Sequence, residues 1–292
     1  MARYAYVNGR YVPHNEAAVH VEDRGFQFAD GVYEVTAVLG GALVDEQGHL
    51  DRLERSLSEL KIAMPMSRPA FKLVMRELVR RNGIKTGLVY QQITRGVAPR
   101  DFKFPKHSDS TLVMTAKHAN LSHIQALESG VRVVTVPDIR WNRRDIKTVA
   151  LLPQVLAKQQ AAGKGAHEAW MVDPDGTVTE GSSSNAWIVN RDGSLVTRHA
   201  NNSILKGITR TSILRLCGEE GVKFEERPFT VDEAYEAREA FMSSATSFVI
   251  PITQIDDRVV GNGQPGSIAL RLREIYLDYA AGLRGDQTRW TA

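Results

Sequence analysis

The sequence contains one cysteine, Cys217, so no disulfide can form within the chain. Cys217 lies in the stretch ITRTSILRLCGEEG, whose apolar spacing is typical of the buried face of a helix. We therefore expect a small core residue there rather than a nucleophile. A reducing compartment fits this cysteine usage.

Strong charge imbalance and long apolar runs are also lacking. The formal net charge is +3 over 292 residues, whereas a nucleic-acid binder usually gathers Lys and Arg in a stripe. No run approaches the about 20 apolar residues of a membrane helix, and the start, MARYAYVNGRYV, has no apolar signal core. These features predict a cytoplasmic protein without nucleic-acid or membrane partners, and no metal site is expected.

The composition is that of an ordinary globular protein, with 42% hydrophobic and 24% charged residues. A prior of about 150 residues per domain suggests two domains. In the first, leucines spaced 3-4-3 indicate an amphipathic helix, and Asn8-Gly9 between two β-rich runs indicates a hairpin. The predicted organisation is a small N-terminal domain, a linker and a large cofactor-binding domain, over residues 1–118, 119–130 and 131–292.

Both halves mix helices and strands. We expect helices over 48–62, 68–84, 148–165, 204–221 and 265–283, and a helix near 229–237 with a capping box of Thr230 and Glu233. We expect strands over 87–96, 110–116, 131–139, 169–173, 177–180, 185–190, 195–197 and 239–244.

Lys147 stands at an element boundary in RWNRRDIKTVALL, residues 140–152. A lysine that forms a Schiff base must lose its proton, which partial burial or cationic neighbours such as Arg143 and Arg144 promote. Taken alone, the residue is better interpreted as an ordinary solvated lysine.

Glu180 ends a strand in TEGSSSNAWIV and is followed by four small residues. Small residues let backbone or a ligand come close to the carboxylate. The alternative is a serine-rich turn that caps the strand.

Two further stretches offer backbone N–H groups to an anion. In SILKGITR, Gly207 precedes a helix whose first N–H groups belong to Ile208 and Thr209. In FMSSATSF, a strand runs into Ser244, Ala245 and Thr246. Ordinary capping and a simple polar turn explain each stretch equally well in isolation.

The combination of these four features predicts a site for pyridoxal 5′-phosphate. The cofactor needs a lysine partner, a carboxylate that keeps its ring nitrogen protonated, and donors for its phosphate.

The chain resembles the fold-type IV pyridoxal-phosphate aminotransferases, most closely their D-amino-acid transaminase branch. The motifs that carry this resemblance span nearly the whole chain: YVNGRYV, FQFADGVYEV, HLDRLERS, RGVAPRDF, RWNRRDIK, TEGSSSNAW, ILKGITR and SSATS. It implies an α+β fold with a small N-terminal α/β domain and a larger, β-barrel-like C-terminal domain flanked by helices. It also implies a homodimer that transfers amino groups between D-amino acids and a 2-oxo acid, 2-oxoglutarate or pyruvate.

The resemblance also implies residue roles. Lys147 would form the Schiff base and carry the proton, Glu180 would pair with the ring nitrogen, and Arg100 would bind the substrate carboxylate through its two-pronged guanidinium. The remaining contacts would be Tyr33 in the substrate pocket, Leu205 against the ring, Arg140 near the phenolic oxygen, and Arg52, Gly207, Ile208, Thr209, Ser244, Ala245 and Thr246 around the phosphate.

One loop departs from the family pattern. D-amino-acid transaminases carry a histidine two residues after the arginine, but this chain reads Arg100-Asp101-Phe102. We expect weaker carboxylate binding and side activity on hydrophobic (R)-amines. Alternatively, Phe102 points elsewhere and Arg95 or Lys103 replaces the missing donor.

Three other functions remain open from the sequence. The scaffold also serves L-specific branched-chain aminotransferases and aminodeoxychorismate lyases. A non-catalytic pyridoxal-phosphate binder or a basic interaction protein is a third alternative, against which Lys147 and Glu180 argue.

Overall fold

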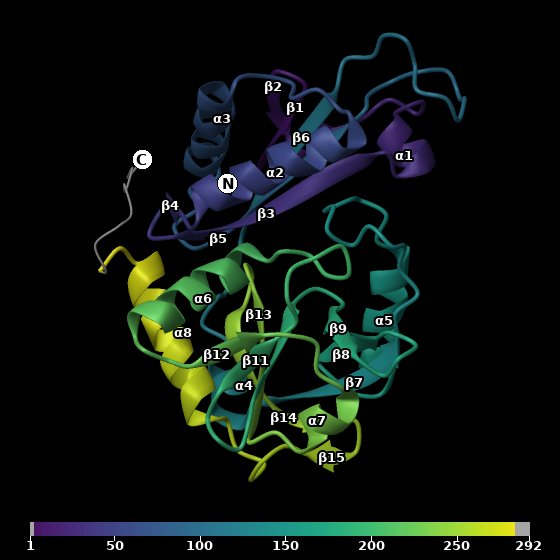
Figure 1. Cartoon of the computed structure of the whole chain (residues 1–292). Helices are drawn as coiled ribbons and strands as arrows, with labels where there is room; N and C mark the ends of the chain where they lie inside the picture. The colour runs from purple at the N-terminus through teal and green to yellow at the C-terminus, as the bar shows by residue number, and fades with distance from the viewer. Residues whose placement is uncertain (1–2, 284–292) are drawn as a thin grey trace. The chain divides into compact units, whose positions relative to one another are not determined.

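The computed structural model describes residues 3–283, which form two compact units (Figure 1). Among the described residues, unit 1 holds 3–121 together with 146–150, and unit 2 holds 122–145 and 151–283. The division differs from the predicted domains at two places. Residues 122–130 belong to unit 2, where 124–129 form a helix, and the segment around Lys147 belongs to unit 1.

Unit 1 contains a sheet of six described strands in the order β2-β1-β6-β5-β3-β4. The predicted hairpin is confirmed, with positive φ angles of 42° at Asn8 and 90° at Gly9, as a tight turn requires. Its elements are β1 (Tyr4–Val7), β2 (Arg10–Pro13), η1 (His14–Glu16), α1 (Arg24–Phe28), β3 (Gly31–Leu39), β4 (Ala42–Leu43), α2 (Glu46–Leu60), α3 (Arg68–Arg81), β5 (Gly87–Thr94) and β6 (Thr111–His118).

Helices α2 and α3 supply one side of the unit 1 core. Three of the four leucines that predicted α2 are buried and Leu60 is partly buried; Phe71, Met75 and Leu78 of α3 are also buried. They share a hydrophobic cluster with Val32 and other alternate residues of the strands. The period-3.6 and period-2 patterns therefore meet in one core, as expected for helices that cover one face of a sheet.

Residues 146–150 pair with β3 through their three middle residues, around an isolated bridge at Thr148. Val32 bridges Thr148, the Tyr33 N–H donates to the Lys147 carbonyl at 3.0 Å, and the Val149 N–H donates to the Gly31 carbonyl at 3.1 Å. The expected helix over 148–165 is therefore wrong at its start: helix α5 spans Leu152–Gly163. The proline in its first turn has no N–H to give, and the residues before it satisfy their backbone on β3 instead.

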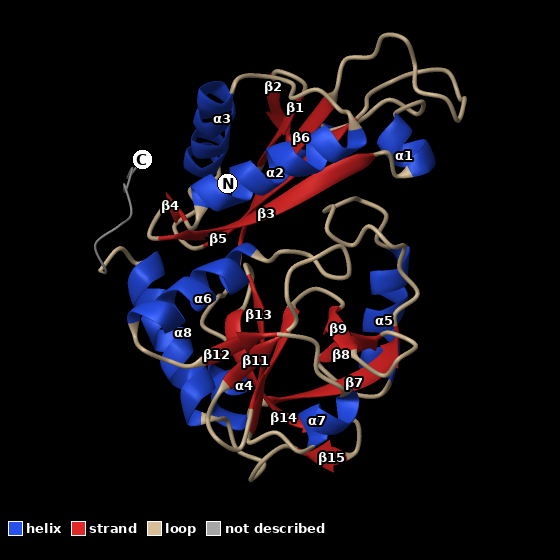
Figure 2. Cartoon of the chain, viewed as in Figure 1, coloured by secondary structure: helices blue, strands red, loops and turns tan. Residues whose placement is uncertain are grey.

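Unit 2 is built on nine described strands in the path β12-β11-β10-β13-β14-β7-β8-β9, with β15 paired to β14 (Figure 2). Besides α5, its elements are α4 (Ile124–Ser129), β7 (Val131–Pro137), β8 (Glu168–Val172), β9 (Val178–Gly181), β10 (Asn185–Val189), β11 (Leu195–Thr197), α6 (Ile208–Glu219), β12 (Phe224–Glu226), α7 (Val231–Tyr235), β13 (Glu239–Ser244), β14 (Phe248–Ile255), β15 (Arg258–Val259) and α8 (Ser267–Ala280).

The central strands of unit 2 are buried on both faces, which explains their continuous apolar runs. Helix α6 packs on β13, α8 packs on β13 and β14, and α5 packs on β7 and β8. The expected α+β fold, with a barrel-like sheet and flanking helices, is confirmed. Cys217 is fully buried in α6, and burial raises the pKa of its thiol to about 12, so it is a core residue as expected.

The capping box of Thr230 and Glu233 is present at the start of α7. Within residues 3–283, no helix has both the length and the apolar character that crossing a membrane requires.

Gly96 fixes the root of the loop that carries Arg100, and it provides a stability test. Its φ is 96°, and a Cβ there would overlap the Asp109 carbonyl oxygen. Gly41 also has a positive φ, 83°, but open space around it. Gly41→Ala should cost about 1–2 kcal/mol of unfolding free energy from backbone strain alone, and Gly96→Ala about 3 kcal/mol. Urea denaturation measures both, and equal losses would contradict the close packing at Gly96.

Candidate active site

Lys147 and Tyr33 lie together in unit 1. The Lys147 ammonium donates to the Tyr33 hydroxyl at 3.2 Å and lies 4.3 Å from the centre of its ring. Their neighbouring positions follow from the pairing of residues 146–150 with β3. Tyr33 in turn stacks on Tyr90, with ring centres 5.7 Å apart. The lysine therefore has a phenolic partner and an aromatic surface beside it.

Arg52 is held by a buried carboxylate that sequence reasoning missed. Its Nε and Nη2 donate to the two oxygens of Glu34 at 2.7 and 2.8 Å, and His49 Nδ1 lies 2.7 Å from Glu34 Oε2. Burial opposes ionisation of Glu34, but Arg52 and His49 outweigh it and lower the pKa to about 2. The feature of the sequence that could have revealed this carboxylate is an acidic residue, Glu34, at a buried position of a strand, β3.

Glu180 is the next-to-last residue of β9 in unit 2 and is buried. Its Oε1 accepts from Arg140 Nη1 at 2.6 Å and from the Leu205 N–H at 3.0 Å. Burial raises the pKa of Glu180, while Arg140 opposes the rise. Among the described residues, Oε2 accepts one hydrogen bond, from Asn185 Nδ2 at 2.9 Å. That oxygen keeps a lone pair for an N–H of a ligand.

Asn185 ties Glu180 to the loop before α6. The same amide nitrogen donates to the Leu205 carbonyl at 3.0 Å. A Cβ at Gly207 would overlap Asn185 Oδ1, so the glycine lets this loop approach the strand. Asn185 is a second residue that sequence reasoning did not assign, although it lies in the TEGSSSNAW motif.

Helix α6 begins at Ile208 without a side-chain cap, because Gly207 occupies the N-cap position. Thr209 is buried in its first turn, and its hydroxyl has no hydrogen-bond partner within the described chain. An unpartnered buried hydroxyl is costly unless a ligand completes it. Together with the first N–H groups of the helix, it forms an anion cradle.

Ser244 ends β13, and Ala245 and Thr246 lie in the turn that leads to β14. The Ser244 hydroxyl contacts those of Thr246 at 3.2 Å and Ser247 at 2.7 Å. These contacts fit a polar turn, and a phosphate contact there stays a prediction.

The three serines after Glu180 face away from it. Ser182, Ser183 and Ser184 all donate to Glu168, which is fully buried in β8. The interpretation as a serine-rich turn is therefore confirmed, and the turn fixes where β9 ends.

The basic run that precedes Lys147 is neutralised by carboxylates. Arg143 pairs with Asp145 at 3.0 Å, and Arg144 pairs with Asp173 at 2.8 Å. Each arginine that the sequence offered as a cationic neighbour of Lys147 therefore has an acidic partner.

Arg100 and Phe102 lie on an exposed loop of unit 1. The Arg100 guanidinium lies 4.7 Å from the ring centre of Phe28, and the Phe102 ring lies 5.5 Å from the same ring. Phe102 is 85% exposed. Arg95 is buried, and its donors go to Asp30 and to backbone carbonyls, so it is a poor replacement for the missing histidine.

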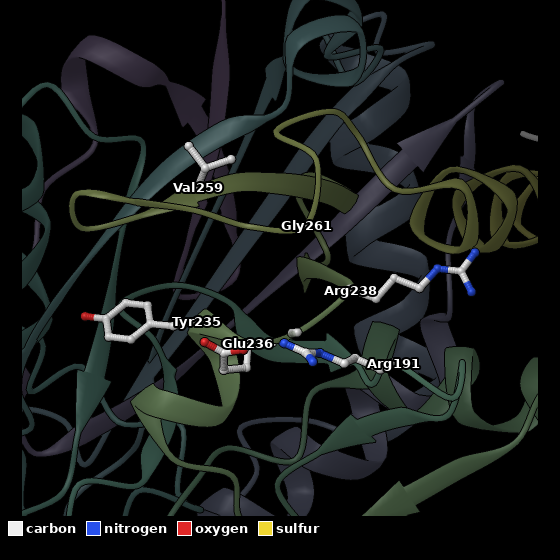
Figure 3. Close-up of a pocket in the computed structure, with 7 residues that line it drawn as sticks. Arg191, Tyr235, Glu236, Arg238, Val259 and Gly261 are labelled. Carbon is white, nitrogen blue, oxygen red and sulfur yellow. Dashed lines mark hydrogen bonds and ion pairs between the residues drawn. The ribbon is translucent and has the colours of Figure 1, made fainter.

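A separate pocket of about 400 Å³ in unit 2 contains none of the predicted site residues. Figure 3 shows the Arg191 side chain reaching toward Glu236, with which it forms an ion pair. This pocket is therefore separate from the surroundings of Lys147 and Glu180. Its lining residues are Arg191, Tyr235, Glu236, Ala237, Arg238, Val259 and Gly261.

Comparison with known proteins identifies the family. Residues 31–255 match the amino-transferase class IV family. A D-alanine aminotransferase of Bacillus licheniformis is 40% identical over 89% of this chain and 91% of its own length. That of Staphylococcus haemolyticus is 39% identical over 94% of this chain and 96% of its own length.

The chain belongs to the class IV aminotransferases.

Solved structures of the same class share the fold of this class IV aminotransferase. A branched-chain amino acid aminotransferase from Thermobaculum terrenum, solved in its PLP form, has a TM-score of 0.87 at 25% identity, covering 97% of this chain and 95% of that one. Another, from Thermoproteus uzoniensis with norvaline, has a TM-score of 0.88 at 26% identity, covering 98% of this chain and 97% of that one.

The residues present fit pyridoxal 5′-phosphate, the cofactor of this aminotransferase. The unpartnered Thr209 hydroxyl suits a phosphate oxygen, and the uncapped helix start suits its negative charge. The lone pair on Glu180 suits a protonated ring nitrogen.

Substitution of Thr209 tests whether this part of the aminotransferase binds the phosphate of the cofactor. Thr209→Val keeps the side-chain shape but removes the unpartnered hydroxyl, so the apoenzyme should melt at the same or a higher temperature. Affinity for pyridoxal 5′-phosphate should fall about tenfold, equal to about 1.4 kcal/mol. The control is Thr211→Val on the exposed side of α6, where the hydroxyl bonds to the Gly207 carbonyl. Unchanged cofactor affinity in Thr209→Val would exclude a phosphate at this hydroxyl.

Proposed function

We propose that this class IV aminotransferase transfers the amino group of D-amino acids to a 2-oxo acid, 2-oxoglutarate or pyruvate. The observation that carries the proposal is the similarity to D-alanine aminotransferases, at 39–40% identity over about nine-tenths of the chain. When bound, pyridoxal 5′-phosphate supplies an electrophilic carbonyl carbon and a ring that accepts electrons.

Lys147 acts at the reacting carbon. Its amine would hold the cofactor at the carbonyl carbon and, once released from it, would move a proton at the substrate Cα as a general acid–base. The Tyr33 hydroxyl, 3.2 Å away, orients that amine. The half-buried setting of Lys147 limits the number of positions its flexible side chain can take.

Glu180 acts at the ring nitrogen. Its Oε2 would accept the ring N–H, while Arg140 and Asn185 hold the carboxylate in place. Arg140 is committed to carboxylates, so we assign it to Glu180 rather than to the phenolic oxygen. Leu205, whose N–H also bonds Glu180, would lie against the ring face.

Charge and N–H groups would hold the phosphate. Arg52 would supply the charge, and Glu34 orients its guanidinium. The start of α6 would supply the Ile208 and Thr209 donors after Gly207. Ser244, Ala245 and Thr246 would contribute further donors.

Substrate recognition depends on Tyr33, Arg100 and Phe102. Arg100 would bind the α-carboxylate, and Phe102 would present an apolar surface instead of a second donor. The exposure of Phe102 leaves its ring accessible to a substrate. These properties support side activity on hydrophobic (R)-amines.

We also propose a cytoplasmic homodimer. The exposed face of α5 presents Leu152, Val155 and Leu156, which are 68%, 58% and 53% exposed. Their spacing places them on one side of the helix. Apolar residues gathered on an exposed face favour contact with another protein surface.

Single-turnover measurements test the reaction and its stereochemistry. Holoenzyme mixed with D-alanine alone should lose the visible absorbance of its cofactor and release one equivalent of pyruvate, whereas L-leucine should cause no change on the same timescale. Lys147→Ala should slow the D-alanine reaction by at least a thousandfold, since general acid–base catalysis contributes about 10²–10⁴ and covalent attachment is also lost. Faster conversion of L-leucine would favour a branched-chain enzyme, and pyruvate formed only from aminodeoxychorismate would favour the lyase.

Phe102→His tests the carboxylate loop. It restores a donor two residues after Arg100, so KM for D-alanine should fall about tenfold, the effect of one charge-assisted hydrogen bond. Turnover of (R)-1-phenylethylamine, detectable in the parent enzyme, should fall because the apolar surface is lost. Phe104→His, on the same exposed loop, is the control. Absence of amine turnover in the parent would reject the relaxed pocket.

A further inference from the structure

Six buried charged side chains of alternating sign run through unit 2 from Glu180. Successive ion-pair distances along this charge ladder are 2.6, 2.7, 3.4, 2.8 and 3.0 Å. Every side chain in it is at most 16% exposed. The order is Glu180, Arg140, Asp138, Arg144, Asp173 and Arg198.

Arg140 is divided between two carboxylates. Its Nε and Nη2 donate to Asp138 at 3.0 and 2.7 Å, and its Nη1 donates to Glu180 at 2.6 Å. Asp138 is held independently, because the Thr179 hydroxyl donates to it at 2.7 Å. The guanidinium is therefore fixed with one N–H directed at Glu180.

The charges nearest to Glu180 add to a negative total. Glu180 and Asp138 together carry two negative charges and Arg140, which contacts both, carries one positive charge. The next cation, Arg144, lies 3.4 Å from Asp138 but pairs more closely with Asp173, at 2.8 Å, so the triplet of Glu180, Arg140 and Asp138 carries about one net negative charge. A single protonated ring nitrogen compensates that charge. Without Asp138, Arg140 would neutralise Glu180 alone, and little net attraction for a ring N–H would remain.

We propose that Asp138 is a positioning residue that, through Arg140, keeps Glu180 oriented and keeps the charge around it negative enough to hold the cofactor ring nitrogen protonated. This inference rests on the proposed contact between Glu180 and that nitrogen. It assigns to the RWNRRDIK region a role separate from that of Lys147: Asp138 and Arg140 set the electronic state of the ring.

The test compares two cofactors by their affinity for apoenzyme. Pyridoxal 5′-phosphate has the basic ring nitrogen, and its 1-deaza analogue has a C–H there. The ratio of their dissociation constants measures the ring-nitrogen contact, while any general damage to the site affects both. Equilibrium dialysis provides both constants without any measurement of turnover.

Asp138→Asn should weaken pyridoxal 5′-phosphate binding at least tenfold and the deaza analogue less than threefold. Asp173→Asn is the matched control, because Asp173 is also a buried ladder carboxylate but does not pair with Arg140. The preference of Asp173→Asn for pyridoxal 5′-phosphate over the deaza analogue should stay within threefold of the parent's. Equal losses for both cofactors in Asp138→Asn, or the same lost preference in Asp173→Asn, would overturn the assignment to Asp138.

Two further proteins complete the experiment. The parent should prefer pyridoxal 5′-phosphate, and Glu180→Gln should abolish that preference; an indifferent parent would reject the Glu180 contact itself rather than the role of Asp138. If Asp138→Asn does not fold, Arg140→Lys replaces it. A single ammonium group cannot bond two carboxylates as the forked guanidinium does. The preference of Arg140→Lys for pyridoxal 5′-phosphate over the deaza analogue should therefore fall at least fivefold. An unchanged preference would overturn the inference.

Discussion

The pairing of residues 146–150 with β3 is the constraint on which the candidate site depends. The Tyr33 N–H to Lys147 carbonyl bond and its neighbour at Gly31 attach a short segment to the unit 1 sheet. Ile146 anchors that segment in the unit 1 core, where it is 4% exposed. Lys147 is thereby fixed beside Tyr33 by backbone geometry, and its position does not depend on side-chain contacts alone.

Buried ion pairs then orient the polar groups within each unit. Glu34 holds Arg52 in unit 1, and Arg140 holds Glu180 in unit 2. Such pairs add little net stability, because desolvation offsets their attraction, but loss of one partner is expensive. Their role here is to orient: each ion pair fixes a charged group in the orientation that a charged ligand requires.

The sequence predicted the elements whose signals are local. The leucine spacing of α2, the Asn8-Gly9 turn and the Thr230 capping box each depend on residues close together in the chain, and all are present. Strand β14 was missed because Pro251 interrupts its apolar run, and proline normally argues against an inner strand. The start of α5 was misplaced because the competing partner, β3, lies more than a hundred residues earlier.

The site was predictable in part for the same reason. Lys147, Glu180 and Arg52 lie in short motifs. Glu34 orients Arg52, and Asp138 and Asn185 support Glu180, through contacts that no local pattern reveals. The serines after Glu180 show that a local pattern can also suggest a contact that is not made. Their spacing suited a ligand, but the structure turns their hydroxyls to Glu168.

The most direct test of the account is the location of the covalent cofactor link. Borohydride reduction of the holoenzyme, followed by proteolysis and mass spectrometry, fixes the cofactor to the lysine that binds it. The account predicts one phosphopyridoxyl group per chain, on Lys147. A phosphopyridoxyl group on any other lysine, or no covalent label in cofactor-loaded enzyme, would contradict it.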